Sequence, residues 1–134
     1  GSAAYVDNMS DAERDAIRLN INLDSVAGHP EITALTSGFE KSEDWMIEQA
    51  QSIGQTIGAH RPMMRTSDQY NFARHGIPAA RLVAGFDRPD SNLKYVLTPA
   101  DNRDKINPAD LARATQLTAS LVFAACTAKT LDLR

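Results

Sequence analysis

The chain alternates between segments with the periodicity of strands and segments with the periodicity of helices, and this order restricts the folds open to it. Polar and apolar residues alternate over 18–23 and 31–37, a pattern typical of half-buried strands. A third strand is predicted over 79–84, after a glycine at position 76. Helices are predicted between and after these strands. We therefore expect an α/β fold in which helices flank a mixed β-sheet of three or four strands.

Helix caps and apolar spacing predict the positions of the helices. Ser10 and Glu13 form a capping-box pattern, which opens a short helix that ends near Ile17. Ser42 is expected to cap a longer helix that ends at Gly58. The apolar face of this helix is predicted from the i, i+4, i+7, i+11 spacing of Met46, Ala50, Ile53 and Ile57.

Two further helices are predicted in the second half of the chain. Ser67-Asp68 caps a short helix that extends to about His75, and Pro108 starts a final helix that extends to about Thr127. A long polar loop separates the strand over 79–84 from this final helix. The inward-facing residues expected on the final helix are Leu111, Thr115, Leu117, Leu121 and Val122.

Composition and charge exclude several classes of partner. A chain of 134 residues, 43% of them hydrophobic, suits one domain that spans residues 1–134. The net charge of −3 and the lack of a basic run predict no nucleic-acid partner, and no apolar stretch is long enough to cross a membrane. The single cysteine, Cys126, can form no intrachain disulfide and lies in an apolar run, so we expect it to be buried.

Asp24 is the best-placed candidate for chemistry. It ends the predicted strand over 18–23, immediately before a turn that contains Gly28, and α/β enzymes collect ligands at such strand ends. The alternative is a turn-capping role, since Asp is a common turn residue. Histidines at positions 29, 60 and 75 share no metal-binding spacing, and the chain has no nucleophile elbow, phosphate-binding loop or dinucleotide fingerprint. The residues alone therefore predict no catalytic constellation.

Four segments carry short motifs in a fixed order. These are Gly-Ser-Ala-Ala-Tyr at 1–5, Asn-Leu-Asp at 22–24, Ser-Asp-Gln-Tyr-Asn-Phe at 67–72 followed by Gly-Ile-Pro-Ala at 76–79, and Thr-Pro-Ala-Asp-Asn-Arg-Asp-Lys-Ile at 98–106. Together they resemble the motifs of the di-zinc aminopeptidases of peptidase family twenty-eight, the leucyl-aminopeptidase and glutamate-carboxypeptidase-like group. The matched segments span most of the chain and correspond to the C-terminal half of such an enzyme.

The resemblance implies a fold, an activity and a cofactor. The fold would be the C-terminal part of a zinc-exopeptidase-like (phosphorylase/hydrolase-like) fold. In the family, two zinc ions clamp a water molecule that attacks a peptide carbonyl. Asp24 would be a zinc ligand, and the parent enzyme would act on a peptide substrate.

The chain departs from the family pattern at several positions. Leu97 stands where the family has its final histidine ligand, and Gln69 stands where the Ser-Asp-His motif has its histidine. The family's His-x-Asp and Glu-Glu motifs precede the first matched segment, and the 134 residues contain no substitute. We therefore expect the C-terminal portion of an aminopeptidase-like hydrolase with an incomplete metal site, which alone neither binds zinc tightly nor cleaves peptides. The alternative is a non-catalytic homologue that acts as a binding or assembly module.

Expectations for substrate and partners follow from the loop over 85–98 and from the sheet. This loop is expected to line the substrate cleft with Arg88, Asn92 and Lys94, although a solvent-exposed connection is the alternative. An unpaired sheet edge or an apolar face would favour a homo-oligomer. The sequence leaves the compartment open, and the resemblance suggests a soluble protein of the periplasm or the exterior.

Overall fold

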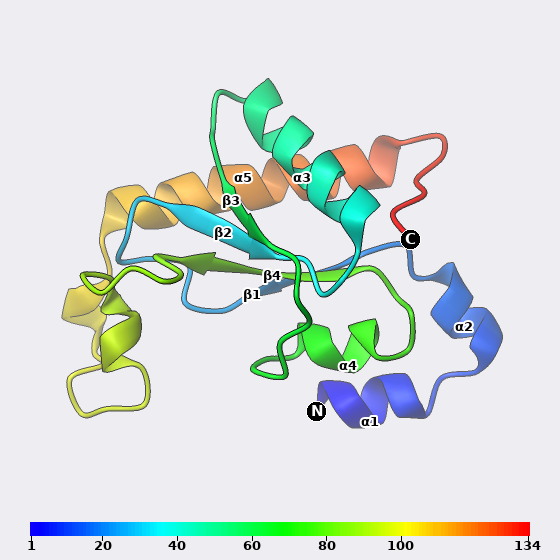
Figure 1. The fold of residues 1–134 in the computed structure, drawn as a ribbon, viewed down its shortest axis with the longest axis horizontal. Helices are drawn as coiled ribbons and strands as arrows, with labels where there is room; N and C mark the ends of the chain where they lie inside the picture. The colour runs from blue at the N-terminus through cyan, green and yellow to red at the C-terminus, as the bar shows by residue number, and fades with distance from the viewer.

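The computed structural model describes all residues, 1–134, and its centre is a four-stranded mixed sheet (Figure 1). The strands are β1 (Asn20–Leu23), β2 (Ile32–Leu35), β3 (Gly58–His60) and β4 (Ala79–Ala84), in the spatial order β1-β4-β2-β3. β4 pairs parallel to β1 and antiparallel to β2, and β3 pairs parallel to β2. The expected α/β class with a mixed sheet is confirmed.

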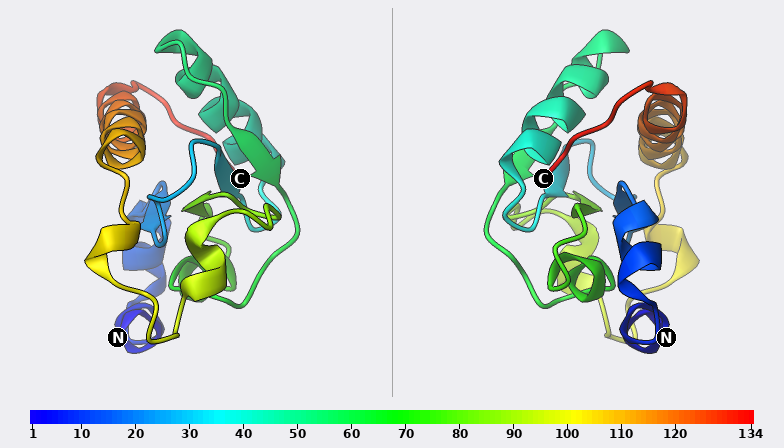
Figure 2. Two further views of the ribbon diagram at one scale, coloured as in Figure 1. Left: turned by 90° about the vertical axis from the view of Figure 1, so that its left-hand side faces the viewer. Right: turned by 90° about the vertical axis from the view of Figure 1, so that its right-hand side faces the viewer.

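Helices cover both faces of this sheet. α3 (Glu40–Ser52) and α5 (Pro108–Thr127) lie side by side on one face, and α1 (Ser2–Asp7) and α4 (Gln69–Ala73) pack together on the other (Figures 1 and 2). α2 (Asp11–Ala16) lies at one end of the molecule. Two 3₁₀ turns, η1 (Asn92–Tyr95) and η2 (Arg103–Lys105), interrupt the long loop between β4 and α5. No helix has both the length and the apolar character that a membrane span requires.

Each face of the sheet has its own hydrophobic cluster. Leu82 of β4, Met46 of α3 and Leu117 of α5 are fully buried in the larger cluster, between the sheet and the long helices. The smaller cluster joins α1, α4 and β4 on the opposite face and contains Val6, Phe72, Ala73, Ile77 and Ala79. Burial of each large aliphatic side chain stabilises the fold by about 1.5–3 kcal/mol. The two clusters therefore hold the sheet in place from both sides.

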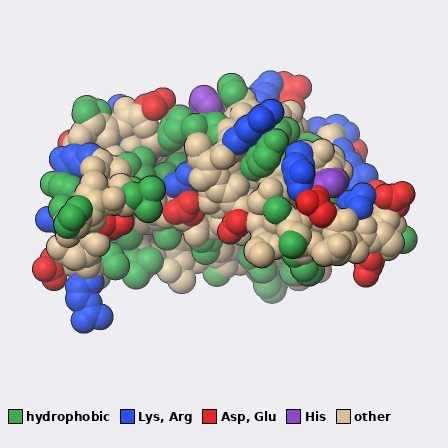
Figure 3. Space-filling view, turned by 90° about the horizontal axis from the view of Figure 1, so that it is seen from below, with side chains coloured by type: hydrophobic (Ala, Val, Ile, Leu, Met, Phe, Trp, Pro, Cys, Tyr) green, Lys and Arg blue, Asp and Glu red, His purple; other side chains and the backbone are tan.

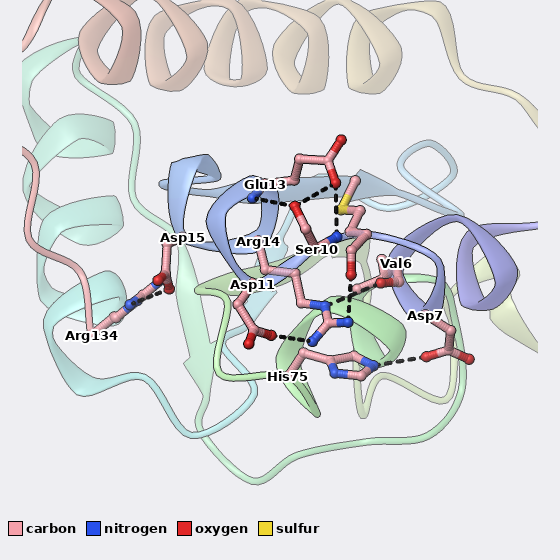
Figure 4. Close-up of polar contacts among 10 residues, drawn as sticks. Val6, Asp7, Ser10, Asp11, Glu13, Arg14, Asp15, His75 and Arg134 are labelled. Carbon is pink, nitrogen blue, oxygen red and sulfur yellow. Dashed lines mark hydrogen bonds and ion pairs between the residues drawn. The ribbon is translucent and has the colours of Figure 1, made fainter.

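The capping box that the sequence predicts is present at the start of α2. The Glu13 backbone N–H donates to Ser10 Oγ, and the Ser10 backbone N–H donates to the Glu13 carboxylate at 2.7 Å, so the capping box is complete (Figure 4). These donors from Ser10 also lower the pKa of Glu13. The prediction of a helix from this motif is confirmed.

The boundaries of α3 differ from the prediction at both ends. The helix begins at Glu40, so Ser42 lies within its first turn, buried, and does not cap it. It ends at Ser52, and Gly54 follows in the left-handed conformation with φ 73°. Ile57 is therefore buried just before β3 instead of on the helix. β3 itself was missed because three residues are too few to show strand alternation.

The inward face of α5 also differs from the prediction. Leu117 and Leu121 are buried as expected, whereas Leu111 and Val122 are 42% and 46% exposed and Thr115 is exposed. The inward stripe instead contains Asp110, Ala114, Leu117 and Leu121. The predicted set mixed this stripe with the neighbouring one, because both are apolar. Cys126, which was expected to be buried, is exposed.

Ion pairs fasten α1 to α4 on the smaller face. Asp7 accepts a hydrogen bond from Arg74, and His75 Nε2 lies 2.8 Å from Asp7 Oδ1 (Figure 4). The Arg74 guanidinium and then the His75 ring lower the pKa of Asp7 through these hydrogen bonds. The ionised form of Asp7 therefore favours the docked position of α1.

Truncation of Leu117 tests the larger cluster. Leu117→Ala is expected to lower the free energy of unfolding by about 2–5 kcal/mol, because the side chain is fully buried between α5 and the sheet. Urea denaturation measures this difference. Phe123→Ala is the control on the same helix, at a side chain that is 70% exposed. Equal losses in the two variants would contradict the described burial.

The lowered pKa of Asp7 predicts that the stability of the chain depends on pH. Its folded pKa lies below the ordinary value of 3.8, so its contribution is present above about pH 4 and is lost as the pH falls through the folded pKa. Asp7→Asn should lower the urea midpoint at pH 7 and have little effect near about pH 2. Glu48→Gln, an exposed charge on α3, is the control. A loss of the same size at both pH values would argue against the ion-paired Asp7.

Candidate functional site

Asp24 lies at the carboxyl end of β1, where the chain leaves the sheet. Parallel pairing places this end beside the carboxyl end of β4, with Asn22 of β1 in register with Arg81 of β4. Open α/β sheets bind ligands at such a junction of strand ends. Ser25 follows with φ 62°, a left-handed conformation that is uncommon for serine, and its carbonyl accepts a hydrogen bond from the Ala84 N–H at 2.9 Å. The turn after Asp24 is thus tied to the end of β4.

Donors from three residues surround Asp24. Ser67 Oγ donates to Oδ2 at 2.7 Å, and Ser25 Oγ donates to Oδ1 at 3.2 Å. Arg81 donates from Nε and a terminal nitrogen to the Asp24 carbonyl at 3.3 Å, and that terminal nitrogen lies 3.4 Å from Oδ2. The Asp24 side chain is 42% exposed, whereas the Arg81 side chain is 13% exposed. A permanent protein cation therefore stands against the carboxylate.

A partly buried hydrogen-bond network supports this arrangement. Asn22 donates to Ser67 Oγ at 2.7 Å and to Gln69 Oε1 at 3.3 Å. Gln69 is fully buried and donates to the Met64 carbonyl at 3.2 Å. Gln69 therefore fixes the loop that carries Ser67. Hydrogen bonds thus join the motifs at 22–24 and 67–72 in the folded chain.

Ser2 of α1, which belongs to the motif at 1–5, contacts the motif at 67–72. Ser2 Oγ donates to Asp68 and accepts a hydrogen bond from Asn71 Nδ2 at 2.8 Å.

Acidic and basic side chains are interspersed over the face of the molecule that carries α1 and α4 (Figure 3). The face therefore carries no uniformly basic patch.

A cleft of about 700 Å³ opens beside Asp24. One wall is formed by residues 24–27 after β1, and the other by residues of the β4–α5 loop from Asn92 to Ile106, with Leu111 of α5. Its apolar lining includes Val26, Leu93 and Ile106. The cleft thus brings the motifs at 22–24 and 98–106 together.

Of the three predicted substrate contacts, only Asn92 lines this cleft. Its Nδ2 donates to the Lys105 carbonyl, and a Cβ added at Gly28 would lie 2.2 Å from that nitrogen. Asn92 is therefore fixed between two loop segments, and Gly28 provides the space that it occupies.

The structure does not bring the other two predicted contacts into the cleft. Arg88 Nε donates to Glu31 Oε2 at 2.8 Å, and Arg88 lines a separate hollow beside β2 and β3. Lys94 Nζ lies 5.2 Å from the centre of the Tyr95 ring. The loop folds back at Gly85, whose N–H donates to the Glu31 carbonyl at 2.8 Å, and this turn carries Arg88 away from Asp24. Substrate contact by Arg88 or Lys94 stays a prediction.

Leu97 lies on the rim of the Asp24 cleft, at the position where the resemblance places a histidine ligand. Its side chain is 98% exposed and its backbone adopts φ 62°. A hydrocarbon side chain has no lone pair to offer a metal. Leu97 and Asp24 therefore line the same cleft.

Sequence reasoning missed Arg81 and Ser67 as contacts of Asp24. Arg81 is the one charged residue of β4, Ala79–Ala84, and a single charge in an apolar strand could have indicated a buried ion partner. Its partner depends on the register of β4 against β1, which the local pattern does not specify. Ser67 was interpreted as a helix cap and as part of the motif at 67–72, and neither interpretation predicted its contact with Asp24.

The residues around Asp24 do not fit a zinc ion. Zinc in proteins is bound by cysteine, histidine and carboxylate groups, with three protein ligands in a catalytic site. No group of three or more such side chains in the structure could hold a metal ion. The neighbours of Asp24 are instead two hydroxyls and the guanidinium of Arg81, which repels a second cation.

Comparisons with known proteins give a family and several solved structures. The model of peptidase family M28 matches residues 1–122. The zinc aminopeptidase BSAP from Bacillus subtilis is 25% identical, with a TM-score of 0.81 over 99% of this chain. An aminopeptidase from Aneurinibacillus sp. strain AM-1 is 22% identical, with a TM-score of 0.78 over 100% of this chain. The LapA aminopeptidase of Legionella pneumophila is 16% identical, with a TM-score of 0.76 over 97% of this chain.

The chain covers 34%, 32% and 36% of these three structures, about a third of their length. No curated protein matches it. The family match includes all four motifs, and the structure joins them through Ser2 and Asp68, Asn22 and Ser67, and the shared cleft. By this match, the chain belongs to peptidase family M28.

Proposed function

We propose that this chain corresponds to the C-terminal portion of a zinc-dependent aminopeptidase-like hydrolase and that it does not hydrolyse peptides on its own. Membership of peptidase family M28 and the likeness to a zinc aminopeptidase support the hydrolase class. The observation that carries the second part is the set of groups around Asp24. One carboxylate, two hydroxyls and a guanidinium cannot hold a catalytic zinc.

The contribution of this chain would be one wall of a peptide-binding cleft. A volume of about 700 Å³ falls within the range of small-molecule sites. Apolar side chains at Val26, Leu93 and Ile106 suit a hydrophobic side chain of a peptide, and the fixed amide of Asn92 offers a polar contact at the same cleft. Metal-binding motifs upstream of residue 1 would complete the site in the whole enzyme.

A second candidate function is that of a non-catalytic homologue, which keeps the fold as a binding or assembly module. The observation that favours it is Arg81. A permanent cation 3.4 Å from Asp24 Oδ2 neutralises the carboxylate without any metal, and Leu97 removes a ligand from the rim. The upstream sequence of the parent discriminates between the two, because intact His-x-Asp and Glu-Glu motifs would favour the enzyme.

Zinc titration tests the first proposal. Calorimetry of the 134-residue chain should show no stoichiometric zinc site with a dissociation constant below about 1 µM, because Asp24 lacks partner ligands. The purified chain should also give no turnover of an aminoacyl anilide in the presence of zinc. A sub-micromolar site that is lost in Asp24→Ala, or measurable hydrolysis, would contradict the proposal.

A double-mutant cycle tests whether Arg81 neutralises Asp24. Asp24→Asn and Arg81→Met should each destabilise the chain, and the double variant should lose less than their sum by about 0.5–1 kcal/mol, a modest coupling because Asp24 is partly exposed. The coupling should shrink at high salt. Urea denaturation of the four proteins measures it, and strictly additive losses would show that the two charges do not interact. Arg61→Met with Glu40→Gln provides a matched cycle at an exposed ion pair.

A further inference from the structure

Two side chains before α4 do not make the contacts that their positions favour. Ser67 and Asp68 are of the residue types that cap helices, yet α4 begins at Gln69 with no hydrogen bond from a side-chain cap. The turn is closed by the backbone alone, since the Tyr70 and Asn71 N–H groups donate to the Ser67 and Asp68 carbonyls. The hydroxyl and the carboxylate are therefore free to bind partners elsewhere in the chain.

Both side chains contact residues that lie far away in the sequence. Ser67 Oγ donates to Asp24 Oδ2 at 2.7 Å, across 43 residues. Asp68 Oδ1 accepts a hydrogen bond from Ser2 Oγ, across 66 residues. A departure from a local preference is expected where a functional site requires it. The start of α4 thus connects α1 on one side with Asp24 on the other.

Ser2 is held between two residues of the motif at 67–72. It donates to Asp68, and its oxygen accepts a hydrogen bond from Asn71 Nδ2 at 2.8 Å. Because the amide nitrogen of Asn71 can only donate, it directs the Ser2 hydrogen toward Asp68. The same two residues share the backbone hydrogen bond from the Asn71 N–H to the Asp68 carbonyl at 3.0 Å. Ser2 therefore fixes the first turn of α4 from outside.

The contacts of Ser67 have the same form. Asn22 Nδ2 donates to Ser67 Oγ at 2.7 Å, which directs the Ser67 hydrogen toward Asp24 Oδ2. Oδ1 of Asp24 accepts from Ser25 Oγ at 3.2 Å and keeps a lone pair, and the Asp24 side chain is 42% exposed. Ser67 thus decides which oxygen of Asp24 is left for a ligand.

The rest of α1 holds Ser2 on a fixed platform. Val6 is fully buried in the cluster that contains Phe72 of α4. Asp7 accepts a hydrogen bond from Arg74, just after α4. α1 therefore contacts α4 at both ends and along its length (Figure 1). A side chain that orients a site is most effective on such a rigid element.

We propose that Ser2 is a positioning residue for the Asp24 cleft. Through Asp68 it fixes the segment that carries Ser67, and Ser67 in turn fixes the Asp24 carboxylate so that Oδ1 remains for a ligand. Ser2 does not line the cleft, so it acts only through these residues. The inference rests on the proposed function, in which this cleft binds a peptide.

NMR spectra of the 134-residue chain test whether Ser2 acts as far as Asp24. The side-chain amide signals of Asn22 and the carboxyl carbon signal of Asp24 report on the two contacts of Ser67. Ser2→Ala should shift these signals in the direction in which Ser67→Ala shifts them, and by less. Asp68→Ala should have the same effect as Ser2→Ala.

Two serine variants provide the controls. Ser2→Thr retains the hydroxyl, so it should leave the Asn22 and Asp24 signals at their original positions. Ser10→Ala removes a hydroxyl that caps α2 and does not contact the motif at 67–72, so it should also leave them there.

Hydrogen exchange separates a local effect from a loss of overall stability. The Asn71 N–H should exchange about two- to tenfold faster in Ser2→Ala, the factor that one lost hydrogen bond accounts for. The N–H of Leu121, buried on α5, should exchange at an unchanged rate.

Two results would overturn the proposal. One is that Ser2→Ala speeds exchange at Asn71 but leaves the Asn22 and Asp24 signals in place, since Ser2 would then only stabilise α4. The other is that Ser10→Ala shifts those signals as much as Ser2→Ala does. These spectra need neither metal nor peptide, so they test Ser2 alone. Zinc binding or turnover by the chain would instead contradict the proposed function.

Discussion

The parallel pairing of β1 with β4 is the constraint on which the rest of the site depends. It sets Asn22 against Arg81, and two residues later the chain turns at Asp24 beside the end of β4. Ser67 then joins Asp24 to Asn22 through one hydroxyl, which donates to the first and accepts from the second. Without this register the order of the strands would not bring the motifs to one cleft, and Asp24 would be an ordinary turn residue.

Asp24 and Arg81 set the charge balance of the site. A partly exposed carboxylate needs little stabilisation, yet Arg81 is largely buried and directs its donors at the Asp24 carbonyl and carboxylate. In our second proposal, this always-charged guanidinium supplies the positive charge that a metal would otherwise supply. Leu97 lies on the rim of the same cleft, and no three metal-ligating side chains gather there.

The sequence predicted what depends on local pattern or on motifs, and failed where long-range pairing decides. The capping box at Ser10, the position of Asp24 and the presence of Asn92 in the cleft followed from the sequence. Arg81 was missed because its partner is set by the β1–β4 register. Arg88 was expected in the cleft because it belongs to the loop over 85–98. The turn at Gly85 toward Glu31, which leads Arg88 elsewhere, cannot be inferred from composition. The outward side of α5 was misassigned because it is as apolar as the inward side.

Crystals of the chain soaked in zinc, measured at the zinc absorption edge, test the central claim most directly. The claim is that the Arg81 guanidinium, and not a metal ion, balances the Asp24 carboxylate in this chain. We predict no anomalous peak within bonding distance of Asp24, with the Arg81 guanidinium still against its carboxylate. An ordered zinc ion bound to Asp24, with Arg81 displaced, would contradict the account.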